Sequence, residues 1–274
     1  MTATTQQALA NCPSSSLPKV SMTSPRDRFL TVMGRKPIIE ALHDQTLGFD
    51  KILVSQSARG PEIDTITGMA ASRKITIERV AEAKVTAVAK SARHHQGVVA
   101  DVIAPAMEHL SDFCEKRRRG KDWACSVLVL DRVHNPANVG MILRSATAAG
   151  IDGVVVPHKG TADIGPVAIK ASAGVAFRAS ILRTEDTLEA LAILEQNRFT
   201  VYGLDGNGQA LFGADLPERA AYIIGNESDG LSANASAACD GLLSIPLDNG
   251  VESLNAAVAA SLVSYEVRRN RAGT

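Results

Sequence analysis

The sequence predicts an α/β protein with two domains. Short apolar runs alternate with segments of helical apolar spacing along most of the chain, and 274 residues are enough to build two hydrophobic cores. The charges are also divided. Residues 1–125 carry 18 Lys and Arg against 13 Asp and Glu, a net of +5, and residues 126–274 carry 11 against 16, a net of −5. This asymmetry fits one domain that holds a polyanion, although chance produces imbalances of this size.

The front half begins with residues 1–26, whose Ser, Thr, Pro and Gln content without periodicity predicts a disordered tail. Residues 27–104 alternate between strand and helix patterns and predict a small α/β domain. The predicted strands cover residues 29–33, 51–55, 75–80 and 97–102, and the predicted helices cover residues 34–42, 63–73 and 84–90.

Two basic loops of this domain are candidates for binding a polyanion. One is the Gly-Arg-Lys turn at residues 34–36, directly before a helix, and the other is residues 91–97, before the last strand. Backbone donors beside cations form anion sites, which makes Arg35, Lys36 and Arg93 candidate contacts. Exposed loops without any ligand explain the same pattern equally well.

Residues 105–125 separate the two halves and contain the run Lys-Arg-Arg-Arg-Gly-Lys. A basic run between folded units predicts a solvated linker, and it can also contact phosphate groups. We therefore predict a basic linker in which Arg117, Arg118 and Arg119 reach the polyanion.

The rear domain, residues 126–274, opens with a nearly continuous apolar run at 126–131, which is typical of a strand buried on both faces of a parallel sheet. Further strands are predicted near residues 153–157, 199–203, 221–225 and 242–245. Three of these strands end in Gly or Pro followed by small polar residues, at Gly203, Gly225 and Pro246. If they are neighbours in one sheet, their ends form one pocket.

The segment after Pro246 predicts a helix from Ser253 to about Arg269, with Ser253 as its N-cap. One stripe of this helix carries the apolar residues, and a second face carries small residues suited to close approach by another element. Ser253 and Asn255 also bring polar groups to the pocket mouth, although capping alone explains the serine. The two faces consist of Leu254, Val258, Leu262 and Tyr265, and of Ala257, Ala260, Ser261 and Ser264.

Residues 135–146 form a polar turn that leads into a helix after the strand at 126–131. Asn138 lies at the helix entry, and Arg144 follows six residues later on a nearby face. A helical arginine with apolar or small neighbours is either a partner in a salt bridge or a functional cation. Taken alone, the pattern favours the salt bridge.

Several classes of protein are disfavoured. No secretory signal or membrane span is recognisable, and the cysteines have neither paired nor metal-ligand spacing. The pair His94 and His95 lacks acidic or cysteine partners at ligand spacing, so no metal site is expected. We predict a reduced, cytoplasmic protein. The cysteines are Cys12, Cys114, Cys125 and Cys239.

Three segments together resemble the signature motifs of the SpoU/TrmH family of RNA ribose methyltransferases. They are N-x-x-x-x-x-R at residues 138–144, G-N-E-x-x-G-L-S at 225–232, and I-P followed by S-L-N within 245–266. Residues 27–104 resemble the small ribosomal-protein-like RNA-binding domain that many members carry. The resemblance implies a C-terminal parallel-sheet methyltransferase domain with a trefoil knot, S-adenosylmethionine as cofactor, and a homodimer packed through the C-terminal domain.

The same resemblance implies the site. Gly203, Gly225, Ile245 and Leu254 would line the cofactor, and Asn138, Arg144, Glu227, Ser253 and Asn255 would form the catalytic and ribose-binding set. A guanidinium hardly deprotonates, so Arg144 is expected to stabilise the developing 2′-alkoxide and to clamp a phosphate.

The implied substrate is a structured RNA, with 23S rRNA favoured because the front domain is separate. The alternatives are a tRNA ribose methyltransferase and a catalytically silent RNA-binding protein of the same fold. A hydrolase that uses Ser253 as nucleophile is disfavoured, because the sequence has no nucleophile elbow and no obvious base.

Overall fold

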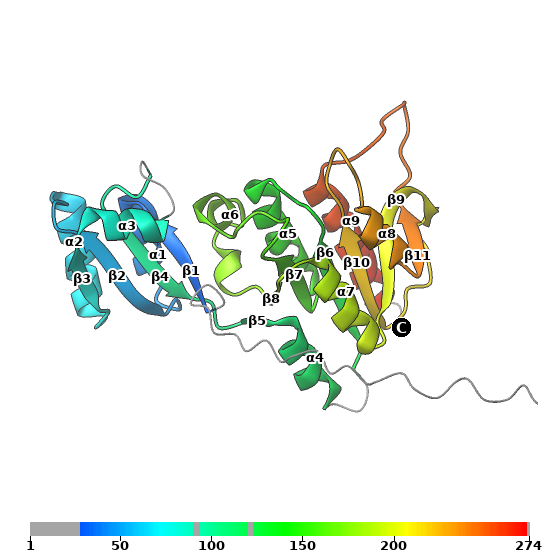
Figure 1. The fold of residues 1–274 in the computed structure, drawn as a ribbon, viewed down its shortest axis with the longest axis horizontal. Coiled ribbons are helices and arrows are strands. Elements are labelled where there is room, and N and C mark those ends of the chain that lie inside the picture. Colours follow the sequence, from blue (N-terminus) through cyan, green and yellow to red (C-terminus); the bar gives the residue numbers. More distant parts are fainter. Residues whose placement is uncertain (1–27, 90–93, 120–122, 273–274) are drawn as a thin grey trace, which may run out of the picture.

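The computed structural model describes residues 28–89, 94–119 and 123–272 (Figure 1). The predicted tail at residues 1–26 and the candidate Arg93 lie outside the described residues. The described chain forms two α/β units, each built around its own sheet.

The front unit contains a four-stranded sheet in the order β1-β4-β2-β3. The pairs β1–β4 and β2–β4 are antiparallel, whereas β2–β3 is parallel. Helices α1 and α2 pack against one face and α3 against the other. Every strand predicted here is present. The elements are β1 (Phe29–Met33), α1 (Arg35–His43), β2 (Phe49–Ser55), α2 (Pro61–Ser72), β3 (Ile77–Val80), α3 (Glu82–Ala89) and β4 (Val98–Ile103).

The rear unit contains a seven-stranded sheet in the order β11-β9-β10-β6-β7-β8-β5, and all of its paired strands are parallel. The predicted parallel sheet is therefore confirmed. Its strands are β5 (Met107–His109), β6 (Cys125–Leu130), β7 (Gly153–Pro157), β8 (Ile181–Thr184), β9 (Thr200–Ala210), β10 (Arg219–Ile224) and β11 (Gly241–Ser244).

Helices cover both faces of this sheet. Leu128 and Leu130 of β6 belong to one core, whereas Val127 and Val129 belong to the other. Because alternate side chains enter different apolar layers, β6 has to be apolar at nearly every position. The first layer contains α5 (Pro136–Ala149), α6 (Pro166–Ala171), the short helix η2 (Val175–Phe177) and α9 (Ala256–Ala272), and the second contains α4 (Leu110–Arg118), α7 (Thr187–Gln196) and α8 (Ala233–Ala237).

The structure differs from the predicted linker. Within residues 105–125, β5 pairs with β8 at the edge of the rear sheet, and α4 packs beneath that sheet. The Nδ1 atom of His109 accepts a hydrogen bond from the backbone N–H of Ser111 at 3.3 Å and caps the helix. Leu110, Phe113 and Cys114 recur at helical spacing and are buried. Lys116, Arg117 and Arg118 of the basic run therefore form the last turn of an amphipathic helix of the rear unit.

Two predicted boundaries in the rear unit were wrong. Strand β9 continues to Ala210 instead of ending at Gly203, because β11 pairs alongside it. A Cβ atom on Gly208 would lie 2.5 Å from the Leu242 carbonyl carbon, so glycine permits this close pairing. Helix α9 begins at Ala256, with Asn255 as its cap: the Asn255 Oδ1 atom accepts a hydrogen bond from the Ala257 N–H at 2.9 Å.

The two faces of α9 have different surroundings. Ala257, Ala260 and Ser264 are buried, and α9 packs against α5, so the small-residue face is used within the chain. The apolar stripe is partly uncovered, with Val258 48% and Tyr265 51% exposed.

Candidate active site

A cavity of about 350 Å³ lies where β9, β10 and β11 approach the loop before α9. The prediction that these strands are neighbours is confirmed, since β9 lies between β10 and β11. Figure 1 shows the β11–α9 loop projecting beyond the sheet. The cavity is lined by residues 204–206 of β9, by 224–230 after β10, and by Leu243, Ile245, Leu247, residues 252–254, Ala256 and Ala259.

The loop after β10 is held in one tight conformation. Asn226 and Gly230 exchange two backbone hydrogen bonds, each of 3.0 Å, and the Asn226 side chain accepts hydrogen bonds from two further backbone N–H groups of the loop. A Cβ atom on Gly225 would lie 2.5 Å from the Gly230 carbonyl group. This loop can therefore close only if residue 225 is glycine, and its backbone forms one wall of the cavity.

The four residues predicted to line a cofactor have different positions. Gly225, Ile245 and Leu254 line the cavity, but Gly203 does not. A Cβ atom on Gly203 would meet Leu231 at 2.5 Å and the Cys239 sulfur at 2.9 Å, so this glycine permits packing behind the cavity. Burial raises the pKa of the Cys239 thiol to about 11, which keeps it protonated and unsuited to nucleophilic chemistry.

Three of the predicted polar residues form one chain of hydrogen bonds. The Asn138 side-chain N–H donates to the Glu227 carboxylate, and the Asn255 side-chain N–H donates to the Asn138 Oδ1 atom at 3.1 Å. Asn138 is only 2% exposed, whereas Glu227 lines the cavity. Residues from α5, from the β10 loop and from the cap of α9 are thereby fixed relative to one another.

The other two predicted catalytic residues are placed differently. Ser253 lines the cavity and is exposed. Arg144 does not line it: this side chain is exposed on α5, and within the described parts of the chain it makes no hydrogen bond or ion pair. It follows Asn138 by six positions along the helix, which turns the two side chains about 120° apart around the helix axis. Within one copy of the chain, Arg144 therefore does not join the hydrogen-bonded residues Asn138, Glu227 and Asn255.

Asp131 and Arg132, which directly follow β6, also hold the cavity loop, although no sequence motif assigned them to the site. Asp131 is 1% exposed, and its carboxylate accepts hydrogen bonds from the Ser232 N–H at 2.7 Å and from the Thr187 hydroxyl at 3.1 Å. The Arg132 carbonyl accepts a hydrogen bond from the Asn226 side chain at 3.0 Å, and its guanidinium donates to the Gly230 carbonyl at 3.2 Å. The one feature of the sequence that could have indicated Asp131 is its position directly after a strand predicted to be buried.

The two basic loops of the front unit lie side by side. The Arg35 backbone N–H donates to the Gln96 side chain at 3.1 Å, and the Arg35 Nε atom donates to the Gln96 carbonyl at 3.3 Å. Arg35 is also paired with Glu62 at 3.4 Å, whereas Lys36 is exposed. The described part of the predicted binding surface is therefore continuous.

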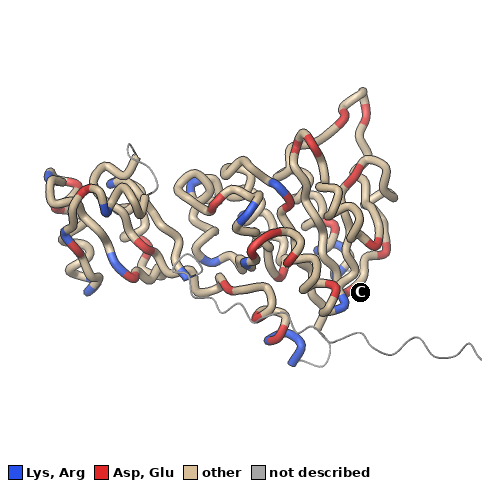
Figure 2. The backbone as a smooth tube through the Cα atoms, viewed as in Figure 1, with Lys and Arg blue, Asp and Glu red and all other residues tan. Residues whose placement is uncertain are grey.

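The basic run of α4 divides into two kinds of residue. Arg117 pairs with Asp152 at 2.9 Å, which ties α4 to the rear unit. Arg118 and Arg119 are exposed at the helix end, where Figure 2 shows a cluster of basic residues. Of these three arginines, Arg118 and Arg119 are the ones available to bind an external phosphate group.

Among the described residues, no helix is long and apolar enough to cross a membrane. In the same part of the chain, no group of three or more His, Cys, Asp or Glu side chains is arranged to hold a metal ion.

Comparisons with known proteins agree on one kind of relative. The sequence model of the SpoU rRNA methylase family matches residues 126–265, and the model named RNA 2′-O ribose methyltransferase substrate binding matches residues 31–107. A protein of Staphylococcus aureus (strain COL), named for the TrmH family of tRNA/rRNA methyltransferases, is 33% identical over 244 residues, which cover 88% of this chain and 96% of the relative.

Solved structures give the same result. The SpoU methyltransferase AviRb from Streptomyces viridochromogenes, in complex with the cofactor AdoMet, has a TM-score of 0.63 and 25% identity, covering 90% of this chain and 92% of the other. A TrmH family structure from Porphyromonas gingivalis has a TM-score of 0.61 and 26% identity, with 89% and 91% covered.

Proposed function

Because the chain belongs to the SpoU/TrmH family of RNA methyltransferases and uses S-adenosylmethionine, we propose that it methylates a ribose 2′-hydroxyl of 23S rRNA in the cytoplasm. The observation that carries this proposal is the hydrogen-bonded chain Asn255–Asn138–Glu227, which ends at the cavity formed by β9, β10 and β11. A polar set fixed at one edge of a parallel sheet is suited to orienting a ribose beside a bound cofactor.

The residues around this cavity fit S-adenosylmethionine, whose sulfonium supplies an electrophilic methyl group. The backbone of the loop at residues 225–230 packs closely because Gly225 has no Cβ atom, and the residues of this loop line the cavity in which the nucleoside would bind. Leu204, Ile245 and Leu254 add apolar surface. Carboxylates along the lining favour the positive charge of the sulfonium and of the amino group; they are Asp205, Glu227, Asp229 and Glu252.

We assign orienting roles to the buried polar chain. The Asn138 side chain donates a hydrogen bond to the Glu227 carboxylate and accepts one from the Asn255 amide. Glu227 can therefore present its remaining lone pairs to the ribose or to the loop backbone. Ser253, exposed at the cavity mouth, has a hydroxyl that can donate to or accept from a ribose oxygen. With the cofactor and the RNA bound, these contacts would orient the 2′-oxygen toward the methyl group.

Arg144 carries the electrostatic part of the proposal. Its planar guanidinium keeps its proton and can bind a phosphate with two parallel hydrogen bonds while it stabilises the developing 2′-alkoxide. The 2′ proton then leaves to phosphate or to water. Since Arg144 is exposed and turned away from Asn138 in its own chain, we propose that it acts at the site of a second subunit.

We propose a homodimer through α5 and α9, which would bring Arg144 to the partner's site. These helices pack together, and their outer sides expose Met141 at 39%, Val258 at 48% and Tyr265 at 51%. Large apolar side chains beside an unpaired arginine are typical of the centre of a subunit interface.

Mixing two inactive variants tests whether Arg144 acts in the partner's site. Arg144→Ala keeps the cofactor cavity, because Arg144 does not line it, whereas Gly225→Ala forces the loop that lines the cavity out of its tight conformation. In a mixed dimer, an arginine supplied by the partner restores one complete site, so activity should rise well above that of either variant alone. If refolded mixtures stay inactive while mass spectrometry shows mixed dimers, Arg144 does not act across the interface.

We also infer the trefoil knot of the family. Helix α9 follows the edge strand β11 and packs against α5, beyond β9 and β10. The Glu266 carboxylate of α9 accepts a hydrogen bond from the Gly213 N–H in the connection between β9 and β10. This contact between the last helix and an earlier loop supports a chain threaded through that loop. Open connections are the rule in proteins, so the family resemblance carries the inference.

Transfer of a labelled methyl group from S-adenosylmethionine to isolated 23S rRNA and to isolated tRNA tests the function and the substrate. We expect incorporation into 23S rRNA that ribose mapping assigns to a 2′-oxygen. Incorporation into tRNA alone would reassign the substrate. Failure of S-adenosylhomocysteine to bind at millimolar concentration in calorimetry would identify a silent RNA-binding protein instead.

A further inference from the structure

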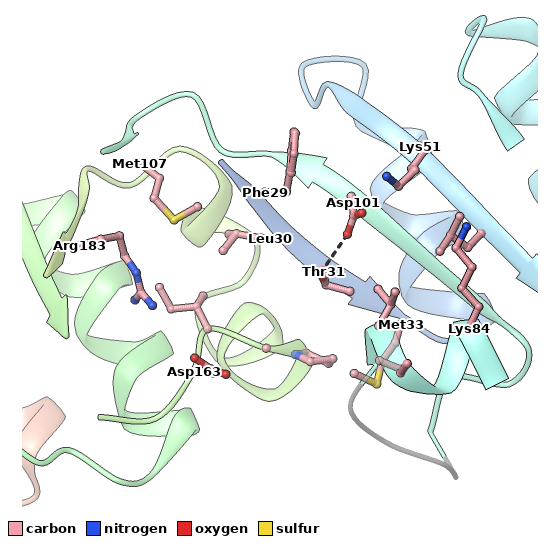
Figure 3. Close-up of a pocket in the computed structure, with 17 residues that line it drawn as sticks. Phe29, Leu30, Thr31, Met33, Lys51, Lys84, Asp101, Met107, Asp163 and Arg183 are labelled. Carbon is pink, nitrogen blue, oxygen red and sulfur yellow. Dashed lines mark hydrogen bonds between the residues drawn. The ribbon is translucent and has the colours of Figure 1, made fainter. Parts of the chain in front are cut away.

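A second cavity, of about 610 Å³, lies between the front sheet and the rear unit (Figure 3). It shares no lining residue with the candidate active site. One side consists of residues from β1, β2, β4 and α3, and the other side consists of Met107, residues 163–166 and Arg183 of the rear unit. The cavity therefore lies at the junction between the regions that match the substrate-binding and methylase models.

This cavity exists because α3 is short. It covers Leu53 and Val99 on one face of the front sheet, but it leaves Thr31, Lys51 and Asp101 on the same face only partly buried. The walls are mainly apolar. The apolar side chains that contribute to them include Phe29, Met33, Val88, Met107 and Ile164.

Polar groups occupy two distinct places in the cavity. Inside, the Thr31 hydroxyl donates to the Asp101 carboxylate at 3.0 Å, and burial raises the pKa of that carboxyl. At the rim, Lys51 and Lys84 have side chains 37% and 57% exposed, and each has one acidic neighbour at 3.5 Å. Exposed pairs of this kind contribute little, so both ammonium groups can exchange their partners for a phosphate.

We propose, building on the proposed function, that this cavity holds one unstacked nucleotide of the RNA substrate. A flat base fits between the Phe29 ring and the facing apolar wall, as proteins commonly bind splayed-out RNA bases. The Asp101 carboxylate accepts a hydrogen bond from the base edge, and Lys51 and Lys84 bind the flanking phosphate.

The chemistry of Asp101 sets the base preference. A carboxylate only accepts hydrogen bonds, so it favours bases with an exocyclic amino group, namely adenine, cytosine and guanine. Uracil presents two carbonyl acceptors and a single N–H donor. Guanine can donate to the carboxylate from two adjacent N–H groups and uracil from only one, so the loss of one hydrogen bond to a charged group predicts about tenfold weaker binding of uridine 5′-monophosphate than of guanosine 5′-monophosphate.

Methionine methyl NMR can detect this binding without any methyl transfer. Met33 and Met107 line the cavity, whereas Met69 lies in α2 and Met141 in α5, so each spectrum carries its own controls. Protein labelled at the methionine methyl carbons and saturated with S-adenosylhomocysteine is titrated with the four nucleoside 5′-monophosphates and with inorganic phosphate. Saturable shifts are expected for Met33 and Met107 only, with the nucleotides and not with phosphate.

A matched pair of variants tests the location. Ala87 is exposed on α3 and lines the cavity, so Ala87→Trp should fill it and abolish the shifts; Ala83 is exposed on the same helix outside the lining, so Ala83→Trp should keep them. No shift with any nucleotide at about 10 mM, the same shift with phosphate alone, or equal behaviour of the two variants overturns the proposal. Failure of the methyltransferase function would appear separately, as loss of S-adenosylhomocysteine binding.

Discussion

Replacing Asn138 by aspartate tests the polar chain at the candidate active site. The wild-type side chain donates to Glu227 and accepts from Asn255, while it is almost completely buried. Asn138→Asp preserves size and the acceptor but removes the donor, and it places a second carboxylate beside Glu227. The substitution therefore changes charge and hydrogen bonding without creating a cavity.

The expected cost follows from two terms. Losing a hydrogen bond to a charged group costs about 1.5–3 kcal/mol. Two carboxylates roughly 4 Å apart repel by about 4 kcal/mol at an effective dielectric constant near 20, so the folded variant takes up a proton instead. The pKa of the new carboxyl is then raised above its unfolded value of about 3.9. The folded state binds more protons than the unfolded state, so stability falls as pH rises through this window.

Chemical denaturation across a pH series measures this effect. We expect Asn138→Asp to lie close to wild type near pH 4, where the protonated carboxyl can donate to Glu227, and to lose about 3–5 kcal/mol by pH 8. Methyl transfer should fall in the same direction. The control is Asn135→Asp at the exposed N-cap of α5, where aspartate is an equally good cap. Parallel pH curves for Asn138→Asp and wild type would refute the hydrogen-bonded chain.

Three further substitutions have defined outcomes. Gly225→Ala should abolish S-adenosylhomocysteine binding in calorimetry, because the new Cβ atom would lie 2.5 Å from the Gly230 carbonyl. The control is Gly68→Ala, whose Cβ atom would have no neighbour within 4 Å and which should bind normally. Normal binding by Gly225→Ala would exclude the tight loop. Asp152→Asn removes the carboxylate that pairs with Arg117 at 2.9 Å and with Arg271 at 2.5 Å. Chemical denaturation should show that the free energy of unfolding falls by about 1–2 kcal/mol. The control Asp112→Asn, at an exposed position, should show no such loss. The hydrogen bond from Arg269 lowers the pKa of Glu266, so the stabilisation by the Glu266 carboxylate is complete above the unfolded pKa of about 4.3 and is lost as pH falls below that value. Glu266→Gln should therefore be less stable than wild type at pH 7. A difference in stability between the two proteins that stays unchanged at pH 3 would contradict this assignment.

The sequence predicted the parts of the fold that depend on local patterns. The apolar run of β6 indicated a strand buried on both faces, and all of its apolar side chains do enter one of two cores. The strand ends near Gly225 and Pro246 indicated a shared pocket, because parallel strands that are neighbours present their carboxyl ends at one edge. Such features need only a few consecutive residues to be recognised.

Features that depend on distant partners were not predictable in the same way. Asn138 and Glu227 are 89 residues apart, and Asn138 and Asn255 are 117 apart, so no local pattern shows that they bond. The helix start at Ala256 was misplaced because Ser253 and Asn255 are both good caps, and only the packed structure selects Asn255. Strand β5 has three residues, too few for a periodic signal.

The positions of Asn138 and Arg144 on one helix imply a division of roles. Asn138 is held by its own chain in a single orientation, so the geometry around Glu227 exists before any substrate arrives. Arg144 is exposed and has no partner among the described residues, so under the proposed function its orientation would come from a second subunit or from an RNA phosphate. If the RNA phosphate supplies this orientation, ordering of the side chain would depend on RNA binding. The guanidinium would stabilise the alkoxide only when a ribose is in position, and the bound cofactor would meet a complete catalytic set only in the presence of its substrate.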